Sequence, residues 1–296
     1  MRLIWSLAGG ATLLVSFPGG AAEPLALEPS SHWQLNYDRG SCRLSRTFGE
    51  GDNQVLAHFI RYTPSPAFEV LLVGEPIDGR NAPLEYSYLP SGAKQDTHMA
   101  MFGETQDGRP TLFLTYQFQD VPGEGNEMAS SEREALIGED IRRITGLRVS
   151  RSVETEVDLR LSGFAKAMQA MDVCLEDLAS SWGFDDEKRA QIAKGAVALN
   201  PEEWAKNIDY PDGLLFRDSR GKVTLKFVVE ESGRATECEV LDEAYSSEFG
   251  DTACKGIMEV ARFEPALDAN SKPVASFYVS TIRFVMPEIE KGRRLR

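Results

Sequence analysis

Short runs of alternating or continuous apolar residues predict a series of strands through the first half of the chain. Turn-forming stretches rich in Gly, Pro, Asn and Asp separate these runs. The expected strands span residues 42–48, 54–61, 68–73, 84–89, 111–117, 145–150 and 153–161. Residues 119–134 predict a polar loop, and a short helix is expected near residues 134–142. The pattern therefore predicts a β-rich N-terminal domain.

A longer helix is predicted at the end of this domain, over residues 163–182. Apolar residues recur there at spacings of three and four, which places them on one face of a helix. They are Phe164, Ala167, Met168, Met171, Cys174, Leu175, Leu178 and Trp182. We expect this amphipathic helix to pack on the strands and to close a domain that spans residues 23–183.

A compact α+β unit is predicted after a connecting stretch at residues 184–207. The acidic residues 185–187 are expected to cap a short helix that includes Val197 and is ended by Pro201. Beyond it, the expected elements are strands at 222–230, 235–241 and 274–285 and a helix at 251–262 that Asp251 caps. The order strand, strand, helix, strand predicts a helix packed on a small antiparallel sheet.

Four cysteines are an even number, which predicts two disulfides in an exported chain and allows three pairings. Cys174 lies on the apolar face of the predicted helix, from which it can reach the strand that Cys42 begins. Cys254 lies on the apolar face of the last predicted helix, above the sheet face to which Cys238 points. We therefore expect the bonds Cys42–Cys174 and Cys238–Cys254.

The first 22 residues have the three parts of a secretory signal peptide. One Arg precedes an apolar run of roughly 15 residues, and small residues ending at Ala22 follow it. The alternative is an uncleaved anchor in the inner membrane, although spanning requires about 20 apolar residues. No later stretch approaches that length. We expect a periplasmic protein with no membrane span after cleavage.

The chain is acidic, with a formal net charge of -14 at pH 7. Removing residues 1–22 removes one Arg and no acid, so the charge of the mature chain would be -15. An acidic surface disfavours nucleic acid as a partner, because phosphate recognition relies on clusters of Lys and Arg. The basic residues of the tail at 289–296 are expected to be solvated. They are Lys291, Arg293, Arg294 and Arg296.

No catalytic, metal or cofactor site is predicted. The three histidines, His32, His58 and His98, stand in no catalytic or metal-binding pattern. Ser91 and Lys94 match the S-x-x-K spacing of serine acylases, but the accompanying elements are absent. We therefore expect a protein that is not an enzyme. The alternative is a cell-wall hydrolase whose two carboxylates, about 5 to 10 Å apart, are brought together by folding.

A series of short motifs over residues 208–288 resembles the TonB C-terminal domain family. The family typically opens with Tyr-Pro, continues through a hairpin with a Gly turn, and has a helix followed by an aromatic-x-Pro-Ala motif before the last strand. The matching residues are Tyr210, Pro211, Gly221, Val223, Phe227, Val229, Ser232, Gly233, Cys238, Val240, Cys254, Phe263, Pro265, Ala266, Pro273 and Val274. Their order and spacing agree with the family.

The resemblance implies a periplasmic domain that docks an extended segment of an envelope or outer-membrane protein alongside its sheet. Such β-augmentation uses main-chain hydrogen bonds at an exposed sheet edge. By motif position, the binding residues would be Tyr210, Pro211, Phe277, Tyr278, Ile282 and Phe284. The alternative is that the Tyr-Pro pair fixes the entry to the first strand and that the other four side chains belong to the core.

Energy-transducing members of that family have an N-terminal membrane helix and a long Pro-rich spacer. Here a globular domain takes the place of the spacer, so the resemblance implies a recognition module without force transduction. The alternative is a structural or regulatory envelope adaptor that uses the same fold without a transport role.

Overall fold

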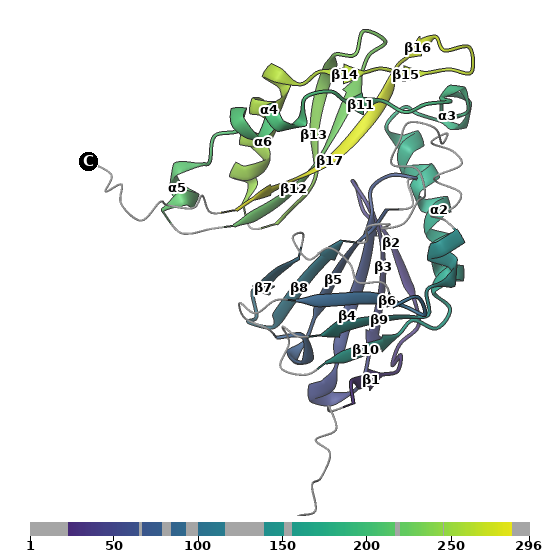
Figure 1. Cartoon of the computed structure of the whole chain (residues 1–296), viewed down its shortest axis with the longest axis vertical. Helices are drawn as coiled ribbons and strands as arrows, with labels where there is room; N and C mark the ends of the chain where they lie inside the picture. Colours follow the sequence, from purple (N-terminus) through teal and green to yellow (C-terminus); the bar gives the residue numbers. More distant parts are fainter. Residues whose placement is uncertain are drawn as a thin grey trace, which may run out of the picture.

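The computed structural model describes residues 23–64, 67–78, 84–92, 100–115, 139–150, 156–216, 220–244 and 246–285. Two units are stacked along the long axis of the molecule (Figure 1). Each unit has its own hydrophobic core. Both the predicted signal peptide and the predicted basic tail lie outside the described residues. Among the described helices, none is long and apolar enough to cross a membrane.

The N-terminal unit is built from two sheets. The larger has the order β2-β3-β4-β5-β8-β7, and every neighbouring pair is antiparallel. Its strands are β2 (Gln34–Tyr37), β3 (Cys42–Phe48), β4 (Val55–Arg61), β5 (Glu69–Val73), β8 (Pro110–Thr115) and β7 (Met101–Glu104). The smaller sheet has the order β1-β10-β9-β6, in which β1 is parallel to β10. Its strands are β1 (Leu25–Leu27), β10 (Val157–Arg160), β9 (Gly146–Ser150) and β6 (Glu85–Leu89).

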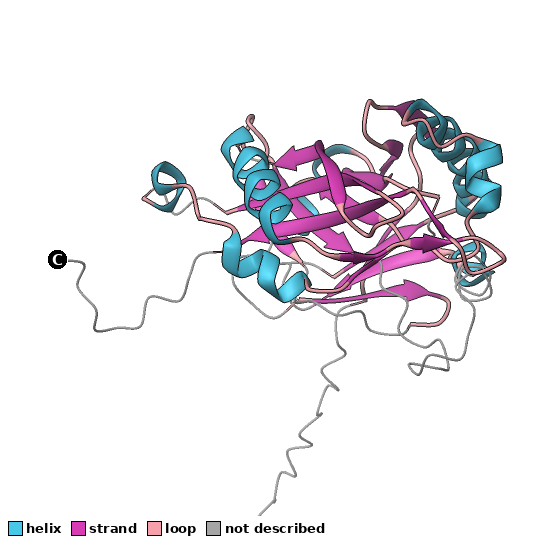
Figure 2. Cartoon of the chain, turned by 90° about the horizontal axis from the view of Figure 1, so that it is seen from above, coloured by secondary structure: helices cyan, strands magenta, loops and turns pink. Residues whose placement is uncertain are grey.

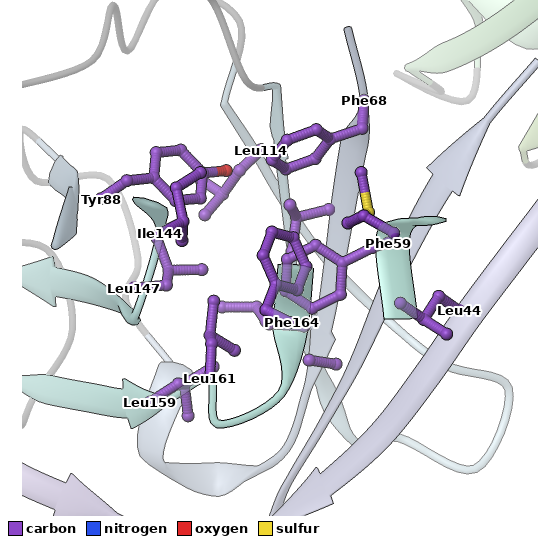
Figure 3. Packing of buried hydrophobic residues seen from close by; sticks show 14 of the residues in the cluster. Leu44, Phe59, Phe68, Tyr88, Leu114, Ile144, Leu147, Leu159, Leu161 and Phe164 are labelled. Atoms are coloured by element: carbon purple, nitrogen blue, oxygen red, sulfur yellow. The ribbon is translucent and has the colours of Figure 1, made fainter. Parts of the chain in front are cut away.

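Helix α2 (Phe164–Ser181) closes this unit along one side (Figure 1). Its buried residues are Ala179 and those of the predicted apolar face, apart from the half-buried Trp182 that follows the helix. The ring of Phe164 packs against that of Phe59 with 4.8 Å between centroids, at the centre of the aromatic core (Figure 3). Cys174 bonds to Cys42 as predicted, with 6.1 Å between their Cα atoms. The disulfide therefore joins the helix to strand β3.

The C-terminal unit is a three-stranded antiparallel sheet of order β13-β12-β17, with helices on one face. Its main elements are α4 (Pro201–Asn207), β12 (Gly221–Val229), β13 (Ala235–Ala244), α6 (Ser247–Val260) and β17 (Ser276–Phe284). Short elements complete it: α3 (Asp186–Gln191), β11 (Val197–Ala198), α5 (Asp212–Leu215), β14 (Phe263–Glu264), β15 (Ala266–Leu267) and β16 (Pro273–Val274). Cys238 bonds to Cys254, which confirms the second predicted pairing. Seen from above, helices lie at the outside of the molecule (Figure 2). The predicted α+β fold is confirmed.

Two predicted helix boundaries are wrong. The connecting helix α3 ends at Gln191, and Val197 lies in strand β11. Pro201 begins helix α4 instead of ending a helix, because the first turn of a helix leaves its amide groups unpaired and tolerates Pro. Helix α6 begins one turn before Asp251, where the side chain of Ser246 accepts a hydrogen bond from the Glu248 amide.

Candidate functional site

Strand β17 is an edge strand of the C-terminal sheet. Among the strands that the structure describes, it pairs with β12 alone, from Gly221↔Phe284 to Val229↔Ser276. An edge strand presents unpaired main-chain N–H and C=O groups along its outer side. This edge can therefore accept a further strand.

A groove of about 760 Å³ runs beside β17, between the two units. Its residues come from three places: the β4–β5 region and the end of β8 in the N-terminal unit, the stretch from α3 to β11, and the first half of β17. The lining is Ile60, Tyr62, Thr63, Pro64, Ala67, Phe68, Glu69, Thr115, Arg189, Ile192, Ala193, Gly195, Ala196, Ser276, Phe277, Tyr278, Val279 and Thr281. The groove is thus a composite of both units.

The predicted binding residues on β17 divide between the two faces of the sheet. Tyr278, Ile282 and Phe284 share the face that packs against the C-terminal core, where Tyr278 lies 5.2 Å from the ring of Phe263. Phe277 lies on the other face, 5.3 Å from the ring of Trp182. The structure therefore brings Phe277 and Tyr278 to the groove and places the other two in or against the core.

Tyr210 and Pro211 stand at the opposite end of the sheet from the groove-lining part of β17. The Tyr210 ring meets the edges of Phe249 and Phe284 at 5.7 and 5.6 Å. Gly221 lies under this aromatic group, and a Cβ atom there would come within 2.4 Å of the Phe249 ring. Tyr210 thus packs on the aromatic rings at the start of β12, and neither Tyr210 nor Pro211 is among the described lining residues of the groove.

The face of β12 that points away from α6 is covered by the N-terminal unit. Lys222 is 4 % exposed, and its Nζ lies 2.6 Å from Glu69 Oε2 and 2.9 Å from Asp242 Oδ2. The hydroxyl of Tyr62 donates to Glu69 at 2.8 Å or to Asp242 at 3.0 Å. Thr281 donates to Glu69 Oε1 at 3.3 Å. We call these five residues the Lys222 cluster; it connects β12, β13 and β17 to the N-terminal unit.

Burial and charge shift the pKa values of two members of the cluster. Burial raises the pKa of Tyr62 well above its usual range, and the neighbouring Glu69 and Asp242 charges add to this effect. Burial alone would also raise the pKa of Asp242. The charge and hydrogen bond of Lys222, with a hydrogen bond from Tyr62, outweigh burial and hold that pKa below its usual range. At neutral pH Asp242 is therefore ionised and Tyr62 keeps its proton.

No motif in the sequence points to the Lys222 cluster. The alternation along β12 was visible, but a polar face on a strand usually indicates contact with water. Only the fold shows that Tyr62 and Glu69 cover Lys222.

His58 has an ordinary structural contact in the larger sheet. Ser45 and the Nδ1 of His58 lie 2.7 Å apart as a cross-strand pair of β3 and β4. Burial, with the charge of Arg43, lowers the pKa of His58 to about 4. Asp185 caps α3 by accepting from the Lys188 amide, which confirms the capping role of the acidic residues there. His98 and Lys94 lie outside the described residues.

No group of three or more His, Cys, Asp and Glu side chains suited to a metal ion occurs within the described ranges. In the groove beside β17, Glu69 is the only carboxylate among the described lining residues, and Lys222 neutralises it.

The comparisons with known proteins concern the C-terminal unit. Residues 206–286 match the model of the family described as Gram-negative bacterial TonB protein C-terminal, which confirms the resemblance seen in the motifs. The solution NMR structure of the Pseudomonas aeruginosa TonB C-terminal domain is similar over 33% of this chain and 90% of its own length, with 26% identity and a TM-score of 0.24. No curated protein matches the sequence. Domains of this family belong to the cell envelope and bind proteins without catalysis.

Proposed function

We propose that this chain is a periplasmic protein-binding protein and not an enzyme. Its C-terminal domain would dock an extended segment of an outer-membrane or other envelope protein along β17. The observation that carries the proposal is the free edge of β17 at the side of a groove, in a domain of a family that interacts with outer-membrane proteins. Main-chain pairing at that edge would supply affinity, and the groove walls would supply selectivity.

The proposed role of the predicted binding residues follows from their positions. Phe277 and Tyr278 would contact the docked segment directly, because both line the groove. Ile282 and Phe284 would support the strand from the core side, and Tyr210 and Pro211 would hold the start of the sheet in place.

Hydrogen exchange of the full chain tests the proposal. An array of 12-residue peptides that cover the periplasm-facing segments of outer-membrane proteins is first screened by fluorescence polarisation. Amide exchange is then compared with and without each binding peptide. We expect slower exchange of β17 amides, by about 100-fold when the peptide concentration is 100 times its Kd. The opposite edge strand β13 is the internal control and should not change. Binding that leaves β17 exchange unchanged would contradict edge docking.

A further inference from the structure

We propose that the N-terminal unit forms the second wall of the docking groove and selects an uncharged, apolar extended segment. This inference rests on the proposed function of β17, and it assigns a recognition role to the unit that the family match leaves unassigned. The arrangement of the wall, its charge balance and the fixed position of β17 relative to it support this role.

The wall is held in place by an ion pair between the buried Arg61 and the half-exposed Asp172. Arg61 is 4 % exposed, and its guanidinium lies 2.5 Å from Asp172 on α2 and donates to the carbonyl of Pro64 at 3.1 Å. This contact ties the end of β4 and the turn after it to the helix. Thr63 and Ile60, which line the groove on either side of Arg61, are therefore presented by a supported segment.

Strand β17 is fixed against that wall by side-chain contacts. Thr281 donates to Glu69, and Arg283 donates to the Thr115 hydroxyl at 3.2 Å. At the other end of the strand, Phe277 packs against the rings that follow α2. The face of β17 that carries Phe277, Val279 and Thr281 thus points toward the N-terminal unit. In a strand added beside β17, alternate side chains would point the same way and meet the wall.

Each charged residue of the described groove lining has a partner of opposite charge within the protein. Glu69 and Arg189 are the only charged residues in the described lining. Lys222 pairs with Glu69, and the Arg189 guanidinium pairs with Asp186 and donates to the Phe184 carbonyl at 2.7 Å. In a chain of net charge -14, this groove therefore presents no net charge.

The chemistry of the occupant follows from this balance. A charged side chain that entered between Ile60 and Val279 would lose water and gain no counter-ion, which costs affinity. Apolar side chains at the same positions would instead bury surface against Pro64, Ala67 and Phe277. The site therefore fits an extended segment with apolar residues at alternate positions.

Defined peptides and a charge placed in the wall test this inference. The probes are two peptides: the Val peptide alternates Val and Thr, and the Glu peptide alternates Glu and Thr. Each has one Lys at either end for solubility. Their binding to the full chain is measured by fluorescence polarisation, and their site by hydrogen exchange. The wall variants are Thr63→Lys, at a half-buried groove position, and Ala67→Lys, at an exposed one. The control is Thr236→Lys, which is exposed on β13.

We expect the wild type to bind the Val peptide about tenfold more tightly than the Glu peptide, or better. Thr63→Lys should reduce this ratio of affinities by about tenfold, because a Lys–Glu pair worth about 1.4 kcal/mol would favour the Glu peptide. Thr236→Lys should keep the wild-type ratio. If peptide binding slows the exchange of β17 amides but the ratio of affinities is unchanged in both wall variants, the role of the N-terminal unit is overturned. Edge docking would then remain intact. If array peptides protect β17 but the Val peptide does not bind, the apolar selection is wrong. If no peptide protects β17, the proposed function falls as well.

Discussion

Replacing Lys222 by Met is expected to lower the free energy of unfolding by about 3–5 kcal/mol, the typical cost of removing one partner from a buried ion pair. The reason is that Glu69 and Asp242 would keep their charges between the two units without a counter-ion. Lys222 is 4 % exposed and lies within 2.9 Å of both carboxylates, so water cannot replace it. Because Asp242 is 30% exposed, the lower end of that range is expected.

The measurement is urea unfolding followed by far-UV circular dichroism and by tryptophan fluorescence, with Lys194→Met as the control. Lys194 pairs with Glu264 at 3.0 Å, but both side chains are nearly half exposed, so its loss should cost at most about 1 kcal/mol. The double variant Lys222→Met, Glu69→Gln should recover part of the loss, since it removes one uncompensated charge. If Lys222→Met costs no more than Lys194→Met, the cluster does not hold the two units together.

The pH dependence gives an independent check of the same cluster. The pKa of Asp242 is held below its usual range in the folded state. Its contribution to the free energy of unfolding is therefore present above the ordinary carboxyl pKa of about 4, and it is lost as the pH falls through the folded-state pKa. The difference in stability between wild type and Lys222→Met should therefore shrink as the pH is lowered from 7 toward 3. A difference that stays constant over this range would refute the electrostatic explanation.

Three further results are expected. Replacing Cys238 and Cys254 by Ser should lower the free energy of unfolding by about 3 kcal/mol, the loop-closure value for a short loop; an unchanged urea midpoint would argue against it. A Cβ atom at Gly40 would lie 2.5 Å from the Leu241 carbonyl oxygen, so Gly40→Ala should cost about 1–3 kcal/mol and speed amide exchange near that contact; wild-type exchange would show that the two units do not touch there. The His58 ring should titrate in NMR with a pKa of about 4, and since this lies below the unfolded value of about 6.5, stability should fall as the pH drops between these values; titration near 6.5 would contradict its burial.

Strands and disulfides could be predicted because local periodicity determines them. The apolar stripe of α2 fixed which face carries Cys174, and β3 was found with its observed bounds. The start of α6 could not be predicted as easily, because Gly250 interrupts the helical pattern. A Cβ atom there would meet Val240 at 2.8 Å, so this Gly is needed for the close approach of α6 to β13.

The contact between the two units could not be predicted from the pattern. Lys222, Thr224 and Lys226 alternate with apolar residues, as they would on a strand with one face in water, yet all three are buried. Periodicity shows that the two faces of a strand differ, but it does not show what covers the polar face. That information depends on Glu69 and Tyr62, which lie some 150 residues away along the chain.

The order of the cysteines along the chain has a consequence for oxidative folding. Each disulfide joins two consecutive cysteines, Cys42 to Cys174 and Cys238 to Cys254, and neither bond spans a cysteine of the other. If the thiols are oxidised in the order in which they are synthesised, each native bond can form before the cysteines of the next bond are present. The chain can therefore reach its native connectivity without thiol–disulfide reshuffling by an isomerase.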